Sequence, residues 1–208
     1  MNHVNTTRFY WEQQEDNSNG MLLNPDAAVI DELEKQEIIG YLPPLEGAEV
    51  LELAAGIGRY TAFFASVADH VTAVDFVEKF IKRNQEINRA SSNITYYCRN
   101  VMEVNFDTGK FDFIFINWLL MYLEDHEVQL LVQRMYQWIK LNGSLFVRES
   151  CFTSSNPDRI HPHTYYRSSN FYLNLFSQHF KLVSHGNISV YEKKYQNPNQ
   201  LYWLFQKN

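Results

Sequence analysis

The stretch "VLELAAGIGRYTAFFASVADHVTAVDF", residues 50–76, constrains the fold of this chain more than any other part of the sequence. Its apolar start, residues 50–53, indicates a buried strand, and residues 59–67 carry apolar and aromatic side chains at helical spacing. A second apolar run at residues 71–74 indicates the next strand. A strand, a helix and a strand in this order predict a βαβ unit.

Two glycines and an acid occupy the places in this unit where a ligand would bind. Gly56 and Gly58 lie in the turn between the first strand and the helix, and Asp75 directly follows the second strand. Glycine lets the backbone approach a ligand closely, and a carboxylate at the tip of the second strand can accept hydrogen bonds from both hydroxyls of a ribose. The arrangement predicts a site for a nucleoside-containing cofactor. A glycine turn that merely links strand and helix is the alternative, and the position of Asp75 disfavours it.

The glycine spacing narrows the choice of cofactor. The dinucleotide fingerprint G-x-G-x-x-G requires a third glycine. Residues 54–59 read AAGIGR and supply only two, so a pyrophosphate site is disfavoured. The pattern E-x-A-x-G-x-G, from Glu52 to Gly58, resembles the loop of methyltransferases that use S-adenosylmethionine, a cofactor with ribose and adenine but no phosphate.

Composition excludes several other classes of protein. The chain has 208 residues, 45% hydrophobic and 15% aromatic, which favours one globular domain. Its formal net charge of −6 and the lack of a basic run disfavour a nucleic-acid partner. Cys98 and Cys151 form no metal or redox motif. The longest apolar region, residues 111–123, is shorter than the roughly 20 residues of a membrane-spanning helix, and the first residues do not resemble a secretory signal. We therefore expect a cytoplasmic protein without membrane insertion.

Alternating helices and strands continue on both sides of the βαβ unit and predict a doubly wound α/β sheet. A helix is expected over residues 24–44, with Asn24 as its cap and Pro25 at its first position. Asn142-Gly143 is expected to turn the chain into the fifth strand. The other expected elements are helices over residues 77–90, 124–140 and 170–180, strands over residues 93–98, 110–117 and 141–150, and a closing antiparallel hairpin made by residues 181–194 and 200–207. The carboxyl ends of the first four strands should line one crevice, where ligands of such folds bind.

Several longer motifs resemble one family in particular. They are "YLPPLEGAEVLELAAGIGR", "NWLLMYL", "RESCF", "HTYYR…FY" and "NQLYWLFQK", and they span nearly the whole chain. In this order they resemble the phosphoethanolamine N-methyltransferases of plants and nematodes, in the domain for the first methylation. The resemblance implies a class I methyltransferase with a seven-stranded, mostly parallel sheet. The expected single domain, residues 1–208, comprises an N-terminal substrate-covering segment and helix (1–45), a cofactor-binding core (46–150) and a substrate loop with the closing hairpin (151–208).

The resemblance also implies S-adenosylmethionine as cofactor and assigns residues to it. Asp75 would bind the ribose hydroxyls, Asn100 and Val101 would lie beside the adenine, and Asn117 would face the methionine end. The full implied set is Glu52, Gly56, Gly58, Asp75, Phe76, Asn100, Val101 and Asn117. Two positions depart from the family pattern: Asn100 stands where relatives usually have Asp, and Ala54 where they usually have Gly. The amide oxygen of Asn100 can still accept a hydrogen bond from the adenine amino group, without the strength of a charged acceptor.

The substrate residues are implied in the same way. The phosphate of phosphoethanolamine would be held by Tyr10, Tyr166, Arg167 and Lys193, with Arg167 gripping it bidentately. Some relatives place a histidine and an aspartate after the fourth strand, where this chain has Tyr122 and Trp118. The general base is therefore open, and Tyr10 and Tyr122 are the candidate catalytic residues.

Alternative readings remain open from the sequence. His161-Pro162-His163 is too weak a pattern for a metal site, and we expect these histidines to belong to a lid loop and the protein to hold no metal. A methyltransferase acting on another small molecule is one functional alternative. A non-catalytic protein that keeps the fold as a binding module is the other.

Overall fold

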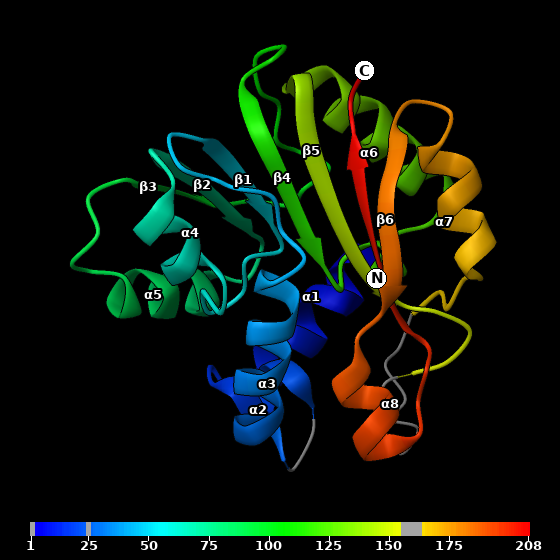
Figure 1. Cartoon of the computed structure of the whole chain (residues 1–208). Coiled ribbons are helices and arrows are strands. Elements are labelled where there is room, and N and C mark those ends of the chain that lie inside the picture. The colour runs from blue at the N-terminus through cyan, green and yellow to red at the C-terminus, as the bar shows by residue number, and fades with distance from the viewer. Residues whose placement is uncertain (1–2, 24–25, 155–163) are drawn as a thin grey trace.

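The chain, described here by a computed structural model over residues 3–23, 26–154 and 164–208, is built on a seven-stranded sheet with the order β3-β2-β1-β4-β5-β7-β6 (Figure 1). Neighbouring strands from β3 to β5 are parallel, whereas β7 runs antiparallel to both β5 and β6. The strands are β1 (Glu49–Leu53), β2 (His70–Asp75), β3 (Ile94–Cys98), β4 (Phe111–Asn117), β5 (Ile139–Ser150), β6 (Lys181–Asn187) and β7 (Gln200–Gln206). The predicted α/β fold class, including its C-terminal antiparallel pair, is confirmed.

Helices cover both faces of this sheet and its lower edge in Figure 1. They are α1 (His3–Gln13), α2 (Ser18–Leu22), α3 (Ala27–Ile39), α4 (Thr61–Val67), α5 (Glu78–Ile87), α6 (Asp125–Trp138), α7 (Ser169–Phe176) and α8 (Ser189–Tyr195), with a 3₁₀ turn, η1, at Leu120–Tyr122. α6 begins with a reciprocal capping box between Glu124 and Glu127, which satisfies backbone N–H groups at the helix start. α1, α2, α3 and α8 gather at the end of the sheet toward which β4 points (Figure 1).

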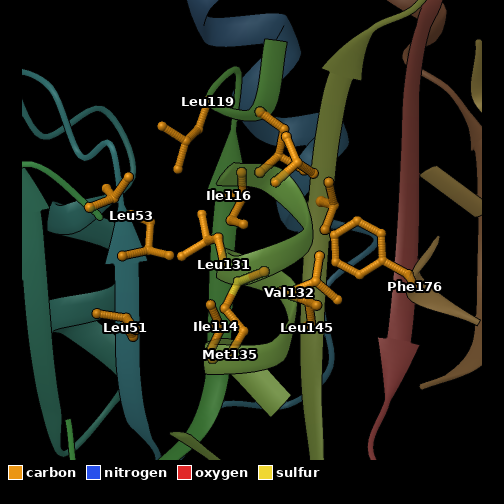
Figure 2. Packing of buried hydrophobic residues seen from close by; sticks show 14 of the residues in the cluster. Leu51, Leu53, Ile114, Ile116, Leu119, Leu131, Val132, Met135, Leu145 and Phe176 are labelled. Carbon is orange, nitrogen blue, oxygen red and sulfur yellow. The ribbon is translucent and has the colours of Figure 1, made fainter. Parts of the chain in front are cut away.

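Alternating side chains on the central strands build two hydrophobic layers. On β4, Ile114 and Ile116 pack with α6 and α7, as Figure 2 shows for Leu131, Val132, Met135 and Phe176. Phe113 and Phe115 point to the other layer, which α3, α4 and α8 cover. The near-continuous apolar run of β4 therefore reflects burial on both faces of the sheet.

The N-terminal region differs from the expectation in having two additional helices. α1 and α2 precede α3, and α3 begins after Asp26. Asn24 and Pro25, the predicted cap and first residue, lie outside the described residues. The sequence of α1 is mostly polar and has no clear apolar stripe, which explains why helical periodicity did not reveal it.

Two expectations, one about a turn and one about a strand, are wrong. Asn142-Gly143 does not end one element and begin another, because both residues lie inside β5, where the pairing with β4 shifts register and Asn142 takes a φ of 63°. An Asn-Gly pair favours positive φ, which suits a strand irregularity as well as a turn. The predicted strand over residues 181–194 ends at Asn187, and its last part forms α8. Lys193 therefore lies on helix α8 and not in a strand of the hairpin.

Candidate active site

A cavity lies at the carboxyl ends of β1, β2, β3 and β4. Side chains of the two N-terminal helices, α1 and α2, form part of its wall. Its lining comprises His3, Val4, Thr7, Trp11, Met21, Glu52, Ala54, Ala55, Gly56, Ile57, Arg59, Tyr60, Asp75, Phe76, Phe80, Asn100, Val101, Phe115, Asn117, Trp118, Leu119, Tyr122 and Leu123. The crevice expected from the order of strands and helices is confirmed, and seven of the eight implied cofactor residues line it.

Two backbone N–H groups hold the carboxylate of Asp75 in place. Its Oδ2 accepts a hydrogen bond from the N–H of Gly56 and its Oδ1 one from the N–H of Val77, each over 2.9 Å. Burial raises the pKa of this carboxyl to about 6. A carboxylate has about four acceptor positions, so each oxygen keeps capacity for a hydroxyl from the cavity. The geometry suits a pair of ribose hydroxyls.

The glycine turn contains one residue that faces the cavity and one that does not. Gly56 has a φ of 54°, and a Cβ there would lie 3.2 Å from the sulfur of Met21. Gly58 has a φ of 88°, and a Cβ there would lie 2.4 Å from Oδ1 of Asn84 on α5. Gly58 is absent from the described cavity lining, so it shapes the turn against α5, and a direct contact with the cofactor stays a prediction. Ala54 carries a φ of 58° at the position where relatives usually have glycine.

Glu52 is a buried acid at the base of the cavity, with only 2% of its surface exposed. The hydroxyl of Thr61 donates to its Oε2 over 2.5 Å, and Nδ2 of Asn84 donates to that hydroxyl over 3.0 Å. Burial raises the pKa of Glu52 to about 8, with the charge of nearby Asp75 acting in the same direction. At neutral pH this group is therefore mostly protonated before any cation binds beside it.

Asn100 is oriented by a neighbouring amide. Its Oδ1 accepts a hydrogen bond from the backbone N–H of Met102 over 3.0 Å. A backbone N–H requires an acceptor, so this bond fixes which atom of the amide is the oxygen. The other atom of this amide, Nδ2, can only donate. Val101 and the half-buried Phe76 line the cavity nearby, and the guanidinium of Arg8 lies 5.4 Å above the centre of the Phe76 ring.

Asn117 is oriented by Arg148, which the sequence did not single out. Nη1 of Arg148 donates to Oδ1 of Asn117 over 3.2 Å, which leaves the amide nitrogen of Asn117 to serve as a donor. The Arg148 guanidinium lies 3.4 Å from the centre of the Trp118 ring and 3.1 Å from Oε1 of Glu34. Both charged side chains are fully buried.

Arg59, which also lines the cavity, connects the glycine turn to α3. Its Nε donates to Oδ1 of Asp31 over 2.8 Å and its Nη2 to Oε2 of Glu34 over 3.1 Å. The hydroxyl of Tyr191 on α8 reaches the same oxygen of Glu34. The position of Arg59 directly after Gly58 was the available sequence signal for this residue.

Two of the residues implied for the substrate gather around Tyr122. Burial raises the pKa of Tyr122 well above its usual value, and the proximity of the Tyr166, Glu149 and Tyr10 side chains adds to this shift. Trp11 of α1 packs edge-on against Tyr122, with 5.7 Å between ring centres. Tyr10, Tyr122 and Tyr166 thus come together although they lie far apart in the sequence.

Arg167 and Lys193 are placed differently. Arg167 is buried, and its Nε, Nη1 and Nη2 donate to Oδ1 of Asp125, the carbonyl of Leu120 and the carbonyl of Leu123, respectively. Lys193 is exposed on α8. None of the four residues implied for the phosphate belongs to the described cavity lining. The structure therefore does not bring them to one point, and their contact with phosphate stays a prediction.

α1 is attached to the core near both of its ends. Nε2 of His3 lies 3.0 Å from Oε2 of Glu127, and its Nδ1 lies 3.3 Å from Oε1 of Glu124. Nζ of Lys79 donates to the carbonyl of Glu12 over 2.6 Å and also reaches the carbonyl of Gln14. These contacts hold α1 beside the cavity, and the covering of a substrate by the N-terminal segment stays a prediction.

His161 and His163 lie outside the described residues. Elsewhere, over residues 3–23, 26–154 and 164–208, no group of three or more potential ligands could hold a metal ion. Within the same parts of the chain, no helix is long and apolar enough to cross a bilayer.

Comparison with known proteins identifies relatives of this arrangement. A sequence profile described as "Methyltransferase domain" matches residues 50–143. Phosphoethanolamine N-methyltransferase 3 of Arabidopsis thaliana is 43% identical over 202 residues, which are 90% of this chain and 41% of that protein. The Triticum aestivum phosphoethanolamine N-methyltransferase is 40% identical over 95% of this chain and 42% of its own length. The chain is a homologue of the phosphoethanolamine N-methyltransferases.

The chain spans less than half the length of these two plant relatives of the phosphoethanolamine N-methyltransferase family. A solved structure of Haemonchus contortus phosphoethanolamine N-methyltransferase 1 superimposes with a TM-score of 0.93 at 28% identity, over 99% of this chain and 49% of that protein. That structure is described as a complex with phosphoethanolamine and S-adenosylhomocysteine.

Proposed function

We propose that this chain transfers a methyl group from S-adenosylmethionine to the amine of phosphoethanolamine. The observation that carries the proposal is the match of 99% of the chain to a protein whose structure holds both phosphoethanolamine and the demethylated cofactor. The methylated product would be an intermediate in the synthesis of phosphocholine. The cavity described above, with its buried acids and oriented amides, is the site where we propose the reaction to occur.

The residues of the cavity fit this cofactor. Asp75 offers two oriented oxygens for the ribose, while Phe76, Asn100 and Val101 form one wall for the adenine. Asn117, held by Arg148, offers a hydrogen-bond donor for the carboxylate at the methionine end. When bound, S-adenosylmethionine supplies a methyl group made electrophilic by its positively charged sulfur.

The tyrosines around the cavity suit the positioning of an amine. Because the pKa of Tyr122 is raised, its hydroxyl stays neutral at physiological pH and can accept a hydrogen bond from the substrate amine without acting as an ionised base. A primary amine with a pKa near ~10, by analogy with lysine, must lose a proton before it attacks. Tyr10 and Tyr122 are proposed to hold the nitrogen in line with the methyl group, an alignment from which much of the rate enhancement would come.

The phosphate contact is proposed at the residues that the family resemblance indicates. Tyr10 and Tyr166 have more support, because both lie near Tyr122, which lines the cavity, although neither of the two lines it. Arg167 has at least three of its five N–H groups directed at protein acceptors, which limits what it can offer a phosphate. Lys193 has the least support, since it lies exposed on α8. The expected cytoplasmic location and the absence of a metal or nucleic-acid partner stay predictions.

A turnover assay tests the proposal directly. Purified protein would be incubated with S-adenosylmethionine and, separately, phosphoethanolamine, its mono- and dimethyl forms, and ethanolamine. We expect methylation of phosphoethanolamine and little or none of ethanolamine, because the phosphate supplies binding energy that orients the amine. Comparable turnover of both amines would favour a methyltransferase for another small molecule. Failure of S-adenosylhomocysteine to bind in calorimetry would instead favour the non-catalytic alternative.

A further inference from the structure

The turn between β4 and α6, residues 118–123, is irregular and largely buried. Backbone N–H and C=O groups removed from water need hydrogen-bond partners, and a segment outside regular helices and strands must find them elsewhere. This turn lines the cavity with Trp118, Leu119, Tyr122 and Leu123. The partners of its backbone therefore determine the shape of one cavity wall.

Glu149, at the end of β5, accepts the N–H groups of the turn. Its Oε1 accepts from Leu119 over 2.9 Å and from Leu120 over 2.6 Å, and its Oε2 accepts from Met121 over 3.3 Å. The Glu149 side chain is fully buried and does not line the cavity. A buried acid directed at three successive amides serves the conformation of that segment.

The segment with Tyr165 and Arg167 supplies hydrogen-bond donors for the backbone carbonyl groups of the turn. Arg167 donates to the carbonyls of Leu120 and Leu123 over 2.8 Å and 2.6 Å, and the N–H of Tyr165 donates to the carbonyl of Met121 over 2.7 Å. The motifs "RESCF" and "HTYYR" thus meet at the third motif, "NWLLMYL". One contributes acceptors and the other contributes donors.

The backbone held in this way includes a strained residue. Trp118 has a φ of 56°, a left-handed conformation that is strained for a bulky residue. Its indole nitrogen donates to Oγ of Ser150 and to Oε1 of Gln200, over 3.0 Å and 3.1 Å. Such strain persists only where surrounding contacts over-determine the conformation, and Glu149 bonds the very next amide.

We propose that Glu149 and Arg167 are positioning residues, which hold the 118–123 turn in the shape that presents Trp118 and Tyr122 to the substrate. Neither needs to touch the reacting atoms. The part of this inference that concerns turnover rests on the proposed methyl transfer to phosphoethanolamine. The part that concerns the conformation of the turn does not depend on the substrate.

The test combines kinetics with hydrogen exchange on Glu149→Gln, which keeps the size of the side chain but removes one acceptor oxygen. Glu149→Asp, a second variant, keeps the charge and withdraws both oxygens from the turn. Glu46→Gln, an exposed change far from the cavity lining, is the matched control. Amide exchange of residues 119–121 would be followed by mass spectrometry in each protein, with amides of β1 and β2 as internal references.

We expect faster exchange at residues 119–121 in both Glu149 variants and in Arg167→Lys, with the reference amides unchanged. The kcat for phosphoethanolamine should fall ~10-fold or more, while the dissociation constant for S-adenosylhomocysteine should change by less than ~2-fold. Wild-type exchange at residues 119–121 in the Glu149 variants would overturn the proposal, as would kcat and cofactor affinity lost in equal proportion. A wild-type protein inactive on phosphoethanolamine would count against the proposed function, whereas the exchange result would still decide the conformational claim.

Discussion

The backbone N–H of Gly56 donates a hydrogen bond to Oδ2 of Asp75 over 2.9 Å, joining the turn after β1 to the tip of β2. This bond connects the glycine turn and the acid, which lie 19 residues apart in the sequence. The carboxyl group orients the turn with one lone pair on Oδ2, accepts the N–H of Val77 on Oδ1, and keeps its remaining lone pairs for a ligand. Loop conformation and ligand binding therefore depend on the same side chain.

Asp75→Ala should weaken the binding of S-adenosylhomocysteine by about 1–3 kcal/mol, because hydroxyl groups of the ligand would be buried without partners. Isothermal titration calorimetry measures this change. Asp69→Ala, an exposed aspartate just before β2, is the control and should bind like wild type. Equal affinity of the Asp75 variant and wild type would mean that the ribose does not bind here.

Asn100→Asp should maintain or tighten cofactor affinity. Oδ1 of Asn100 is bonded to the N–H of Met102, which leaves this oxygen one lone pair for an adenine amino group, whereas Nδ2 can only donate. A carboxylate would keep the bond to Met102 and present a charged acceptor to the adenine. Calorimetry on the two proteins under identical conditions gives the comparison. A large loss of affinity would show that the adenine lies elsewhere in the cavity.

Affinity for S-adenosylmethionine should rise as pH increases from 6 to 8. The pKa of Glu52 is raised to about 8 and that of Asp75 to about 6, so both carry protons over parts of this range in the ligand-free protein. A cationic ligand favours the ionised forms, and below each pKa its binding must first expel a proton. Calorimetry at three pH values, in buffers of different ionisation enthalpy, would count the protons released. In Glu52→Gln the dependence between pH 7 and 8 should flatten, and an equally steep dependence there would exclude Glu52 as its source.

Ala54→Gly should stabilise the protein by up to about 1 kcal/mol. Ala54 has a φ of 58°, where a Cβ costs roughly 1–2 kcal/mol, and the greater entropy of glycine in the unfolded chain offsets part of the gain. Urea unfolding followed by circular dichroism measures the free energy. Ala62→Gly, at an exposed position in the α4 helix, should destabilise the protein and so serves as the opposite control. A loss of stability in the Ala54 variant would show that its backbone is unstrained.

Arg167→Ala separates a phosphate-binding role from a positioning role. Loss of a phosphate contact should raise KM for phosphoethanolamine and leave kcat nearly unchanged, whereas loosening of the 118–123 turn should lower kcat. Because Arg167 donates hydrogen bonds to the backbone of this turn, we expect the fall in kcat to dominate, with cofactor affinity nearly unchanged. Steady-state kinetics with saturating S-adenosylmethionine distinguishes the two results, and a pure KM effect would contradict the positioning role.

The central part of the fold was predictable from the sequence because burial on both faces leaves a strong pattern. β1, β2 and β4 are strands of five to seven residues that are buried at most positions, with Asp75 at the end of β2 and Asn117 at the end of β4. The cavity at their carboxyl ends follows from the topology of a parallel sheet. Asp75 and Asn117 could be placed there for that reason alone.

The rest of the site depends on contacts that no local pattern encodes. α1 is mostly polar, and its position over the cavity follows from bonds between its ends and the distant residues Glu127 and Lys79. The resemblance assigned Arg167 to the phosphate and gave no role to Glu149 of "RESCF", and it did not reveal that both residues bind the backbone of one turn. Which partner a buried charge finds is a tertiary property, and spacing along the chain does not contain it.

The ion pair between Glu34 on α3 and Arg148 on β5 has a consequence for how this sequence can change over evolutionary time. Both side chains are fully buried, and Arg59 shares the same carboxylate. Replacing one member of such a pair leaves an uncompensated buried charge, at a cost of about 3–5 kcal/mol, comparable to much of a domain's total stability. Single substitutions at either position should therefore be eliminated by selection, whatever the substrate of the protein. Across its relatives, positions 34 and 148 should vary together or remain fixed, which makes them a covarying pair separated by 114 positions in the chain.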